Sequence, residues 1–208
     1  TPTLSNLAPT NGGIISCSGS ATDADNDPLT EGYEWVNDTT GVSLSSFANY
    51  QLSSSDISPG DTLTCIYTAS DGYDSTFASA SATVGNALPV ITNHTLFPST
   101  PGFTETITCQ ASISEPDGET YTEDYEWRND TTGVVISTTT PLVLDTSMGT
   151  LGDQISCTLS VTDASGGVAT SNTSALIEGP NSPPIIASLS LAPDPVYTDE
   201  NLSATIST

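Results

Sequence analysis

Apolar and polar residues alternate along two stretches of the chain that lie far apart in the sequence. The apolar positions are Leu63, Cys65, Tyr67 and Ala69 in the first stretch, and Ile155, Cys157, Leu159 and Val161 in the second. A period of two predicts β-strands that bury one face. Short turn-forming runs such as Asp25-Asn26-Asp27-Pro28 separate these stretches from their neighbours, and no segment has a helical period. The pattern predicts an all-β chain.

The same pattern of residues occurs twice, at an offset of 92 residues. Each copy holds two cysteines 48 residues apart, with a tryptophan between them. The repetition predicts one domain over residues 1–86 and a second over residues 87–179. A third copy begins at Pro183-Pro184 but includes only its first two strands, so residues 180–208 are predicted to be an incomplete third repeat. The aligned residues include Trp35 with Trp127, Asn37-Asp38-Thr39-Thr40 with Asn129-Asp130-Thr131-Thr132, and Gly60-Asp61 with Gly152-Asp153.

The Cys–Trp–Cys spacing resembles that of the immunoglobulin sandwich, in which a tryptophan on strand C packs on a disulfide between strands B and F. The acidic loop at residues 22–30, followed by Tyr33-Glu34-Trp35, is similar to the PKD-like and cadherin-like repeats of large secreted bacterial and archaeal cell-surface proteins. The resemblance implies tandem immunoglobulin-like Greek-key β-sandwiches, each with one B–F disulfide, in an extracellular or cell-surface setting. It implies no specific biochemical activity.

The four cysteines allow three disulfide pairings. The equal spacing favours Cys17 with Cys65 and Cys109 with Cys157, one disulfide in each sandwich. The alternative, a metal-binding or catalytic thiol, has neither C-x-x-C spacing nor a histidine partner in the sequence. We therefore expect structural disulfides.

The chain carries a formal net charge of −24, with Arg128 as its one basic residue besides a single histidine. Such a charge repels nucleic acid and anionic membrane surfaces, so neither is an expected partner. Divalent metal ions are favoured instead. No apolar run approaches the roughly 20 residues that span a bilayer, and no membrane insertion is expected in this segment. Because the chain shows no signal peptide and does not begin with Met, we expect a segment of a larger protein.

Acidic residues gather in the predicted B–C and F–G loops of both copies. In an immunoglobulin-like topology these loops lie at the end where the preceding domain arrives, and the cadherin-like resemblance implies an ion at that joint. Carboxylates at alternate positions suit Ca²⁺, which takes six to eight oxygen ligands. The alternative is an acidic turn that is simply solvated. The predicted ligands are Asp23, Asp25, Asp27, Asp71 and Asp74 in the first copy, and Glu115, Asp117, Glu119 and Asp163 in the second.

Five Asn-x-Ser/Thr sequons are predicted sites of glycosylation. Two of them fall in matching turns between strands C and C′, which we expect to be exposed. Asn-Asp turns are favoured at such positions without any sugar, so both interpretations stay open. The five residues are Asn37, Asn93, Asn129, Asn172 and Asn201.

No catalytic arrangement is visible, and we expect that the chain is not an enzyme. His94 stands alone and is interpreted as incidental. Two functions are considered. The first is a structural subunit or stalk of an extracellular filament, associating with itself or with neighbouring repeats, with strand donation by residues 184–208 as one means of linkage. The second is an adhesin or receptor segment that recognises a glycan or a protein. The scarcity of aromatic and arginine anchors favours the first.

Overall fold

The computed structural model describes residues 1–179, 188–192 and 203–207. Residues 3–83 form a sandwich of seven strands in two sheets. One sheet has the order β1-β2-β5, with β1 (Thr3–Leu4), β2 (Ile14–Ser18) and β5 (Asn49–Gln51). The other has the order β4-β3-β6-β7, with β4 (Val42–Ser45), β3 (Thr30–Asn37), β6 (Thr62–Ser70) and β7 (Ser75–Thr83).

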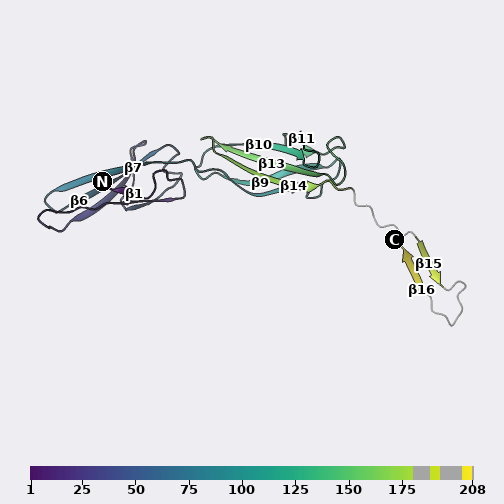
Figure 1. Ribbon diagram of the computed structural model, residues 1–208, viewed down its shortest axis with the longest axis horizontal. Coiled ribbons are helices and arrows are strands. Elements are labelled where there is room, and N and C mark those ends of the chain that lie inside the picture. Colours follow the sequence, from purple (N-terminus) through teal and green to yellow (C-terminus); the bar gives the residue numbers. More distant parts are fainter. Residues whose placement is uncertain (180–187, 193–202, 208) are drawn as a thin grey trace.

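The second sandwich repeats this arrangement and follows the first end to end (Figure 1). Its smaller sheet has the order β12-β9-β8, with β8 (Val90–Phe97), β9 (Thr106–Ser114) and β12 (Leu142–Val143). Its larger sheet has the order β11-β10-β13-β14, with β10 (Tyr121–Asn129), β11 (Val134–Ser137), β13 (Gln154–Asp163) and β14 (Val168–Leu176). In immunoglobulin terms both sandwiches pair strands A, B and E against G, F, C and C′, so the predicted fold class is confirmed.

Each core is built around a tryptophan and a disulfide. Cys17 is bonded to Cys65, and Cys109 to Cys157, which confirms the predicted pairing. Each bond joins strand B to strand F across the two sheets. Trp35 lies opposite Cys65 in the register of β3 with β6, and it is fully buried. Trp127 holds the same position in the second core, opposite Cys157.

The two aligned asparagines of the C–C′ turns are buried, which corrects the expectation that they are exposed. The Asn37 side chain is 0% exposed, and its Nδ2 donates to Asp61 Oδ2 at 2.7 Å. Asn129 makes the equivalent bond to Asp153 at 2.9 Å. Because these amide nitrogens are buried and hydrogen-bonded, this fold disfavours glycosylation at Asn37 and Asn129. The pairs also explain why the Asn-Asp and Gly-Asp dipeptides recur together in both copies.

Two further strands follow the second sandwich. β15 (Ser188–Ala192) pairs antiparallel with β16 (Ser203–Ser207), in a register that sets Leu189 opposite Ile206. The two strands predicted for the third repeat therefore pair with each other. The rest of the predicted donor segment, at residues 184–187, 193–202 and 208, lies outside the described residues, as does Asn201. Within the part of the chain that the structure describes, no helix is long and apolar enough to cross a membrane.

Candidate functional site: the joint between the two sandwiches

A short linker, residues 84–89, connects β7 to β8 and is hydrogen-bonded to both sandwiches. On the first side, Gly85 N donates to Pro9 O at 2.8 Å, and Val84 N donates to Asp61 O at the same distance. On the second side, Ala87 N donates to Asp117 Oδ2 at 2.6 Å. A linker fixed in this way transmits the orientation of one domain to the next.

Asp117, in the B–C loop of the second sandwich, is the central residue of the joint. Its side chain is 5% exposed. Besides the bond from Ala87, its Oδ1 accepts a hydrogen bond from Asn11 Nδ2, in the A–B turn of the first sandwich, at 2.6 Å. Next to it, Gly118 has a φ of +71°, and an added Cβ there would lie 3.5 Å from Ser54 Cβ. Both carboxylate oxygens of Asp117 are thus occupied as hydrogen-bond acceptors that connect the domains.

A second contact across the joint involves Asp163, at the end of strand F. Asn86 Nδ2 of the linker donates to Asp163 Oδ2 at 2.9 Å, and Gly167 N donates to Oδ1 at 2.6 Å. A Cβ at Gly167 would lie 2.4 Å from both Asn86 Nδ2 and Asp163 Oδ2, so a larger residue there would displace these two side chains and disturb their hydrogen bond. The F–G loop therefore approaches the linker closely.

Three of the predicted metal ligands gather beside these contacts. Carboxylate oxygens of Glu115, Glu119 and Asp163 all lie within 4.8 Å of one another. Oε2 of Glu115 and Oε2 of Glu119 are buried without a hydrogen-bond partner, as are Oδ1 of Asn11 and Oδ1 of Asn86. Burial raises the pKa of Glu115, and the charges of Asp163, Asp117 and Glu119 raise it further. Crowded, partly desolvated oxygens of this kind are what a hard cation binds.

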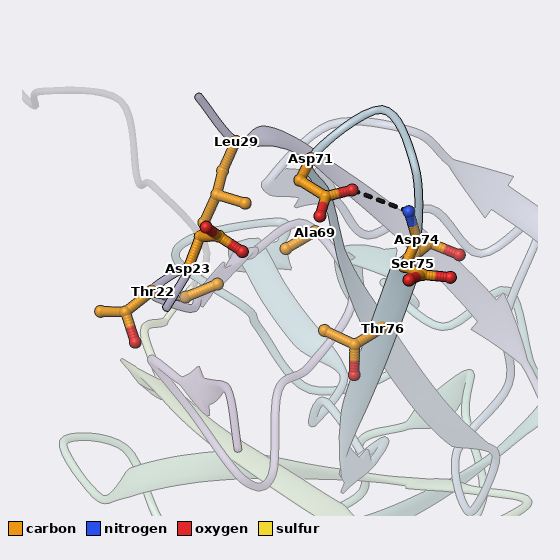
Figure 2. A pocket seen from close by; sticks show the side chains of 9 residues that line it. Thr22, Asp23, Leu29, Ala69, Asp71, Asp74, Ser75 and Thr76 are labelled. Atoms are coloured by element: carbon orange, nitrogen blue, oxygen red, sulfur yellow. Dashed lines mark hydrogen bonds between the residues drawn. The ribbon is translucent and has the colours of Figure 1, made fainter. Parts of the chain in front are cut away.

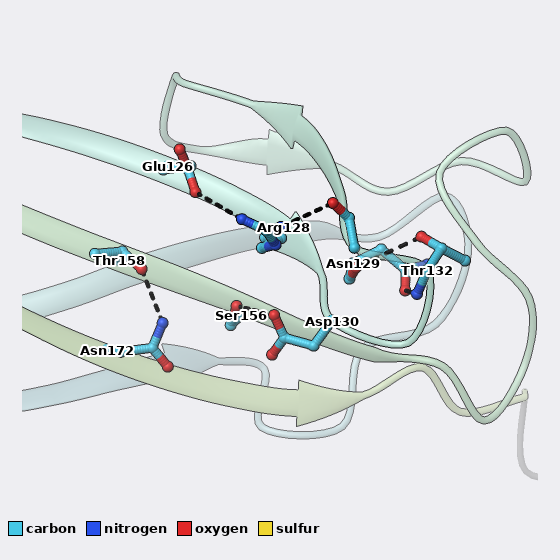
Figure 3. Close-up of polar contacts among 9 residues, drawn as sticks. Glu126, Arg128, Asn129, Asp130, Thr132, Ser156, Thr158 and Asn172 are labelled. Atoms are coloured by element: carbon cyan, nitrogen blue, oxygen red, sulfur yellow. Dashed lines mark hydrogen bonds and ion pairs between the residues drawn. The ribbon is translucent and has the colours of Figure 1, made fainter.

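No base neutralises this cluster among the residues that the structure describes. Their one ion pair joins Arg128 and Glu126 at 3.9 Å, on the surface of β10 (Figure 3). Arg128 also donates from a guanidinium nitrogen to Gly133 O at 2.9 Å. The single arginine of the chain thus supports the C–C′ turn.

Of the corresponding acids of the first sandwich, Asp23 and Asp71 are half-buried and Asp74 is exposed (Figure 2), as are Asp25 and Asp27. Asp23, Asp71 and Asp74 line a pocket of about 180 Å³. Asp23 Oδ1 accepts the backbone N–H groups of Asp25 and Asp27, at 2.8 and 3.0 Å. Asp71 Oδ1 accepts those of Tyr73 and Asp74, and these bonds, the one from Asp74 first, lower the pKa of Asp71. The carboxylates of these loops thus stabilise the backbone of their own turns. Within the described chain, no three acids gather in these loops as closely as at the joint.

His94 has a partner that sequence reasoning missed. Its Nε2 lies 3.0 Å from Cys109 Sγ, and its Nδ1 lies 2.9 Å from Ser171 Oγ. Burial lowers the pKa of this imidazole. The interpretation of the cysteines as lacking a histidine partner is therefore wrong for the second disulfide, whereas the interpretation that His94 is not catalytic stays a prediction.

The two remaining sequons within the described residues are exposed. Asn93 has a φ of +52°, and Asn172 Nδ2 donates to Thr158 Oγ1 at 2.8 Å (Figure 3). Glycosylation at Asn93 and Asn172 stays a prediction.

Comparison with known proteins assigns no family. No family model matches the chain, and no curated protein matches it. Among solved structures, the chain is similar to the three N-terminal domains of the bacteriophage RB49 Highly Immunogenic Outer Capsid protein (Hoc). The identity is 13% and the TM-score 0.35, over 100% of this chain and 69% of that one. At these values the likeness carries no argument about function.

Proposed function

We propose that this chain is a stalk segment of an extracellular or cell-surface fibre, built from immunoglobulin-like domains in a fixed end-to-end relation. The observation that carries the proposal is the position of Asp117, which accepts hydrogen bonds from Asn11 of the first sandwich and from Ala87 of the linker. Domains of one chain move relative to each other unless their interface prevents it. A stalk needs that restraint, because a free hinge would neither hold its end away from a surface nor transmit force.

The two disulfides support the extracellular part of the proposal. Each closes a loop of 48 residues between the two sheets of its own sandwich. Such bonds persist in oxidising surroundings, outside the reducing cytosol of most cells. In the chain-entropy model a loop of this length contributes about 4 kcal/mol to stability, which suits a fibre exposed to proteases and shear.

Calcium at the joint is the second element of the proposal. Glu115, Glu119 and Asp163 supply the carboxylates, and the unpartnered Asn86 Oδ1 belongs to a side chain already bonded to Asp163. Ca²⁺ accepts six to eight oxygens at 2.3–2.6 Å, with water completing an incomplete protein set. A bound ion would neutralise the mutual repulsion of these acids and add a link between linker and loop. Asp117 is not one of the three residues whose carboxylate oxygens gather within 4.8 Å of one another, and its oxygens connect the linker and Asn11 instead.

Ligand recognition is the alternative function, and one group of side chains favours it. Three aromatic residues of the first sandwich are at least 74% exposed: Phe47, Tyr73 and Phe77. Exposed aromatic residues are common anchors of binding surfaces. An adhesin of this type would bind a glycan or protein on the first sandwich and use the second as a spacer.

Electron microscopy and small-angle X-ray scattering of the purified chain test the stalk. We expect an elongated particle whose maximum dimension equals two sandwiches in line, with a narrow distribution of inter-domain angles. A broad distribution of angles would overturn the rigid joint. Fibres in the full chain that disappear on deletion of residues 184–208 would support strand donation, whereas undiminished assembly of the deletion variant would exclude that segment as the link.

A further inference from the structure

A β-bulge in strand A turns His94 towards the second disulfide. The register of β8 with β9 shifts between Thr92 and Thr95, and Asn93 within the shift has a φ of +52°. Bulges of this kind redirect a side chain relative to the regular alternation of a strand. His94 Nε2 consequently lies 3.0 Å from Cys109 Sγ. The bulge in strand A thus places the imidazole of His94 next to the disulfide that joins strands B and F.

We propose that reduction of the Cys109–Cys157 disulfide converts this cluster into a binding site for a thiophilic divalent cation, held by His94 Nε2 and the two cysteine sulfurs. The three donor atoms lie within 4.8 Å of one another. Two thiolates and one imidazole suit Zn²⁺, which binds four donors in a tetrahedron and accepts water as the fourth. The inference goes beyond the stalk function and is independent of the calcium site.

The conversion balances with a dithiol as the reductant. Two electrons from the dithiol break the Sγ–Sγ bond, the dithiol closes to its own cyclic disulfide, and Cys109 and Cys157 become thiols. Binding of the cation then displaces one proton from each thiol. Zn–S bonds of about 2.3 Å in a tetrahedron place two sulfurs about 3.8 Å apart. The two cysteine Cα atoms, 6.3 Å apart, leave room for this separation by side-chain rotation.

Ser171 on β14 supplies the outer support that a metal-bound histidine needs. Its Oγ lies 2.9 Å from His94 Nδ1. Histidines that bind a metal through one ring nitrogen commonly donate a hydrogen bond from the other, which fixes the ring and its tautomer. A serine hydroxyl both donates and accepts. Ser171 can therefore donate to Nδ1 while Nε2–H faces the disulfide, and accept from Nδ1–H when Nε2 binds the cation.

An open hollow beside Cys109 gives access to the cluster. Asn93, Thr95, Cys109 and Tyr125 are among the residues that line it. A reductant, a cation and the water that would complete the tetrahedron can approach Cys109 from this side. Cys157 is fully buried on the other side of the bond.

The first sandwich contains an internal control. The offset of 92 residues that aligns Cys17 with Cys109 places Pro2 where His94 stands. The register supports this alignment, because Leu4 lies opposite Cys17 just as Leu96 lies opposite Cys109. Reduced Cys17 and Cys65 thus have no imidazole at this position. The same reduced chain should bind the cation in one sandwich and not in the other.

The test compares oxidised and reduced full-length chain. The chain is reduced with dithiothreitol, desalted without oxygen and equilibrated with Zn²⁺; bound zinc is counted, and free thiols are then alkylated with iodoacetamide. We expect one more Zn²⁺ per reduced chain than per oxidised chain. Mass spectrometry should show Cys109 and Cys157 alkylated about tenfold more slowly than Cys17 and Cys65. Equal zinc in the two forms, or equal alkylation of all four cysteines, would overturn the proposal.

Two variants separate metal binding from a change in folding. His94→Gln should lose the additional Zn²⁺, and Ser171→Ala should weaken its binding by about 10-fold to 100-fold. With Co²⁺ in place of Zn²⁺, the reduced native chain should gain a thiolate-to-cobalt absorption band that His94→Gln lacks. Unchanged zinc affinity in His94→Gln contradicts the proposal. So does a reduced native chain that loses its β-strand circular dichroism and does not regain it with Zn²⁺.

Discussion

The two sandwiches carry the same acids at the same end, yet these acids have different surroundings. At the offset of 92 residues, Asp23, Asp25, Asp27 and Asp71 correspond to Glu115, Asp117, Glu119 and Asp163. In the first sandwich Asp25 and Asp27 are exposed, and the half-buried Asp23 and Asp71 accept hydrogen bonds from the backbone of their own loops. In the second, Asp117 and Asp163 accept hydrogen bonds from Asn11 of the first sandwich and from the linker. The cover by a neighbouring domain, more than the residue types, distinguishes a solvated turn from a joint.

The difference also separates two uses of a buried carboxylate. Asp117 has an amide or backbone N–H donor for each oxygen, so its burial is compensated by hydrogen bonds. Glu115 and Glu119 each leave one oxygen without a donor. A buried polar atom without a partner calls for an explanation such as a water or an ion. The first residue connects the domains directly, whereas the other two fit a ligand.

The largest expected effect comes from removing the direct connection. Asp117→Ala leaves the Asn11 amide and the Ala87 N–H without their acceptor inside the joint. A buried group that loses its partner costs about 1–3 kcal/mol, so the loss of the acceptor for two donors should weaken the joint by about 2–6 kcal/mol in total. Nuclear magnetic relaxation should show the two sandwiches tumbling as one body in the native chain and separately in the variant.

The aligned substitution Asp25→Ala is the matched control, because Asp25 is exposed in the first sandwich. It should leave the tumbling of both domains unchanged. If Asp117→Ala and Asp25→Ala behaved alike, the cover by the neighbouring domain would have no mechanical consequence, and the contrast between the two ends would fail.

Calcium should produce the next largest change in stability, and only through the acidic cluster at the joint. An ion that binds the folded state alone, at 100 times its dissociation constant, stabilises that state by about 2.7 kcal/mol. We therefore expect calcium to raise the melting temperature of the second sandwich and a chelator to reverse the change. The double variant Glu115→Gln, Glu119→Gln should abolish the response. The aligned double variant Asp23→Asn, Asp27→Asn should retain it; a loss in both would mean that calcium acts on general charge rather than at the joint.

The fold could be predicted because its signals are local and occur twice. Alternation around Cys65 and Cys157 identified strand F, and the shared spacing favoured the two disulfides that the structure contains. The Asn37 sequon was misinterpreted for the opposite reason. Its burial depends on Asp61, 24 residues away, and nothing within the three-residue motif reports that partner.

The site could be predicted only in part, because its contacts cross domain and strand boundaries. The spacing of acids identified loops whose carboxylates gather at the joint, but it treated Asp117 as a ligand equal to Glu115. The bond from Asn11, 106 residues earlier, assigns Asp117 another role. His94 was missed because the bulge at Asn93 breaks the alternation from which inward positions are read.

The pH dependence of stability should have opposite signs for Glu115 at the joint and for Asp71 in the first sandwich. In chelator, the raised pKa of Glu115, caused first by burial, makes this residue stabilise the fold most at low pH. That contribution is fully present below the unfolded value near 4.5 and is lost as the pH rises through the folded value. The lowered pKa of Asp71 acts oppositely: its contribution is present above 3.8 and is lost as the pH falls through the folded value.

Substitutions should therefore move the pH profile of stability in opposite directions. Glu115→Gln should gain stability relative to the native chain at pH 7 and gain none at pH 4. Asp71→Asn should lose stability at pH 7 and lose progressively less as the pH falls below 3.8. Thermal melting from pH 2.5 to 7 measures both. Profiles displaced in the same direction would show that the two acids have equivalent surroundings.

The smallest change in stability is expected when the acidic side chains of the second B–C loop are introduced into the B–C loop of the first sandwich. Asp23→Glu with Asp27→Glu reproduces the pair Glu115 and Glu119 in a loop that the described chain leaves uncovered. Asp23 would lose its backbone bonds to Asp25 and Asp27, which lie at the surface. Surface changes of this kind usually stay within about 0.5 kcal/mol, so we expect almost no change in stability.

We also expect no second calcium ion in a calorimetric titration, since exposed carboxylates without a covering domain remain solvated. A second ion bound as tightly as the first would mean that glutamate geometry creates the site, and that the contacts with Asn86 and Asn11 are not needed for it.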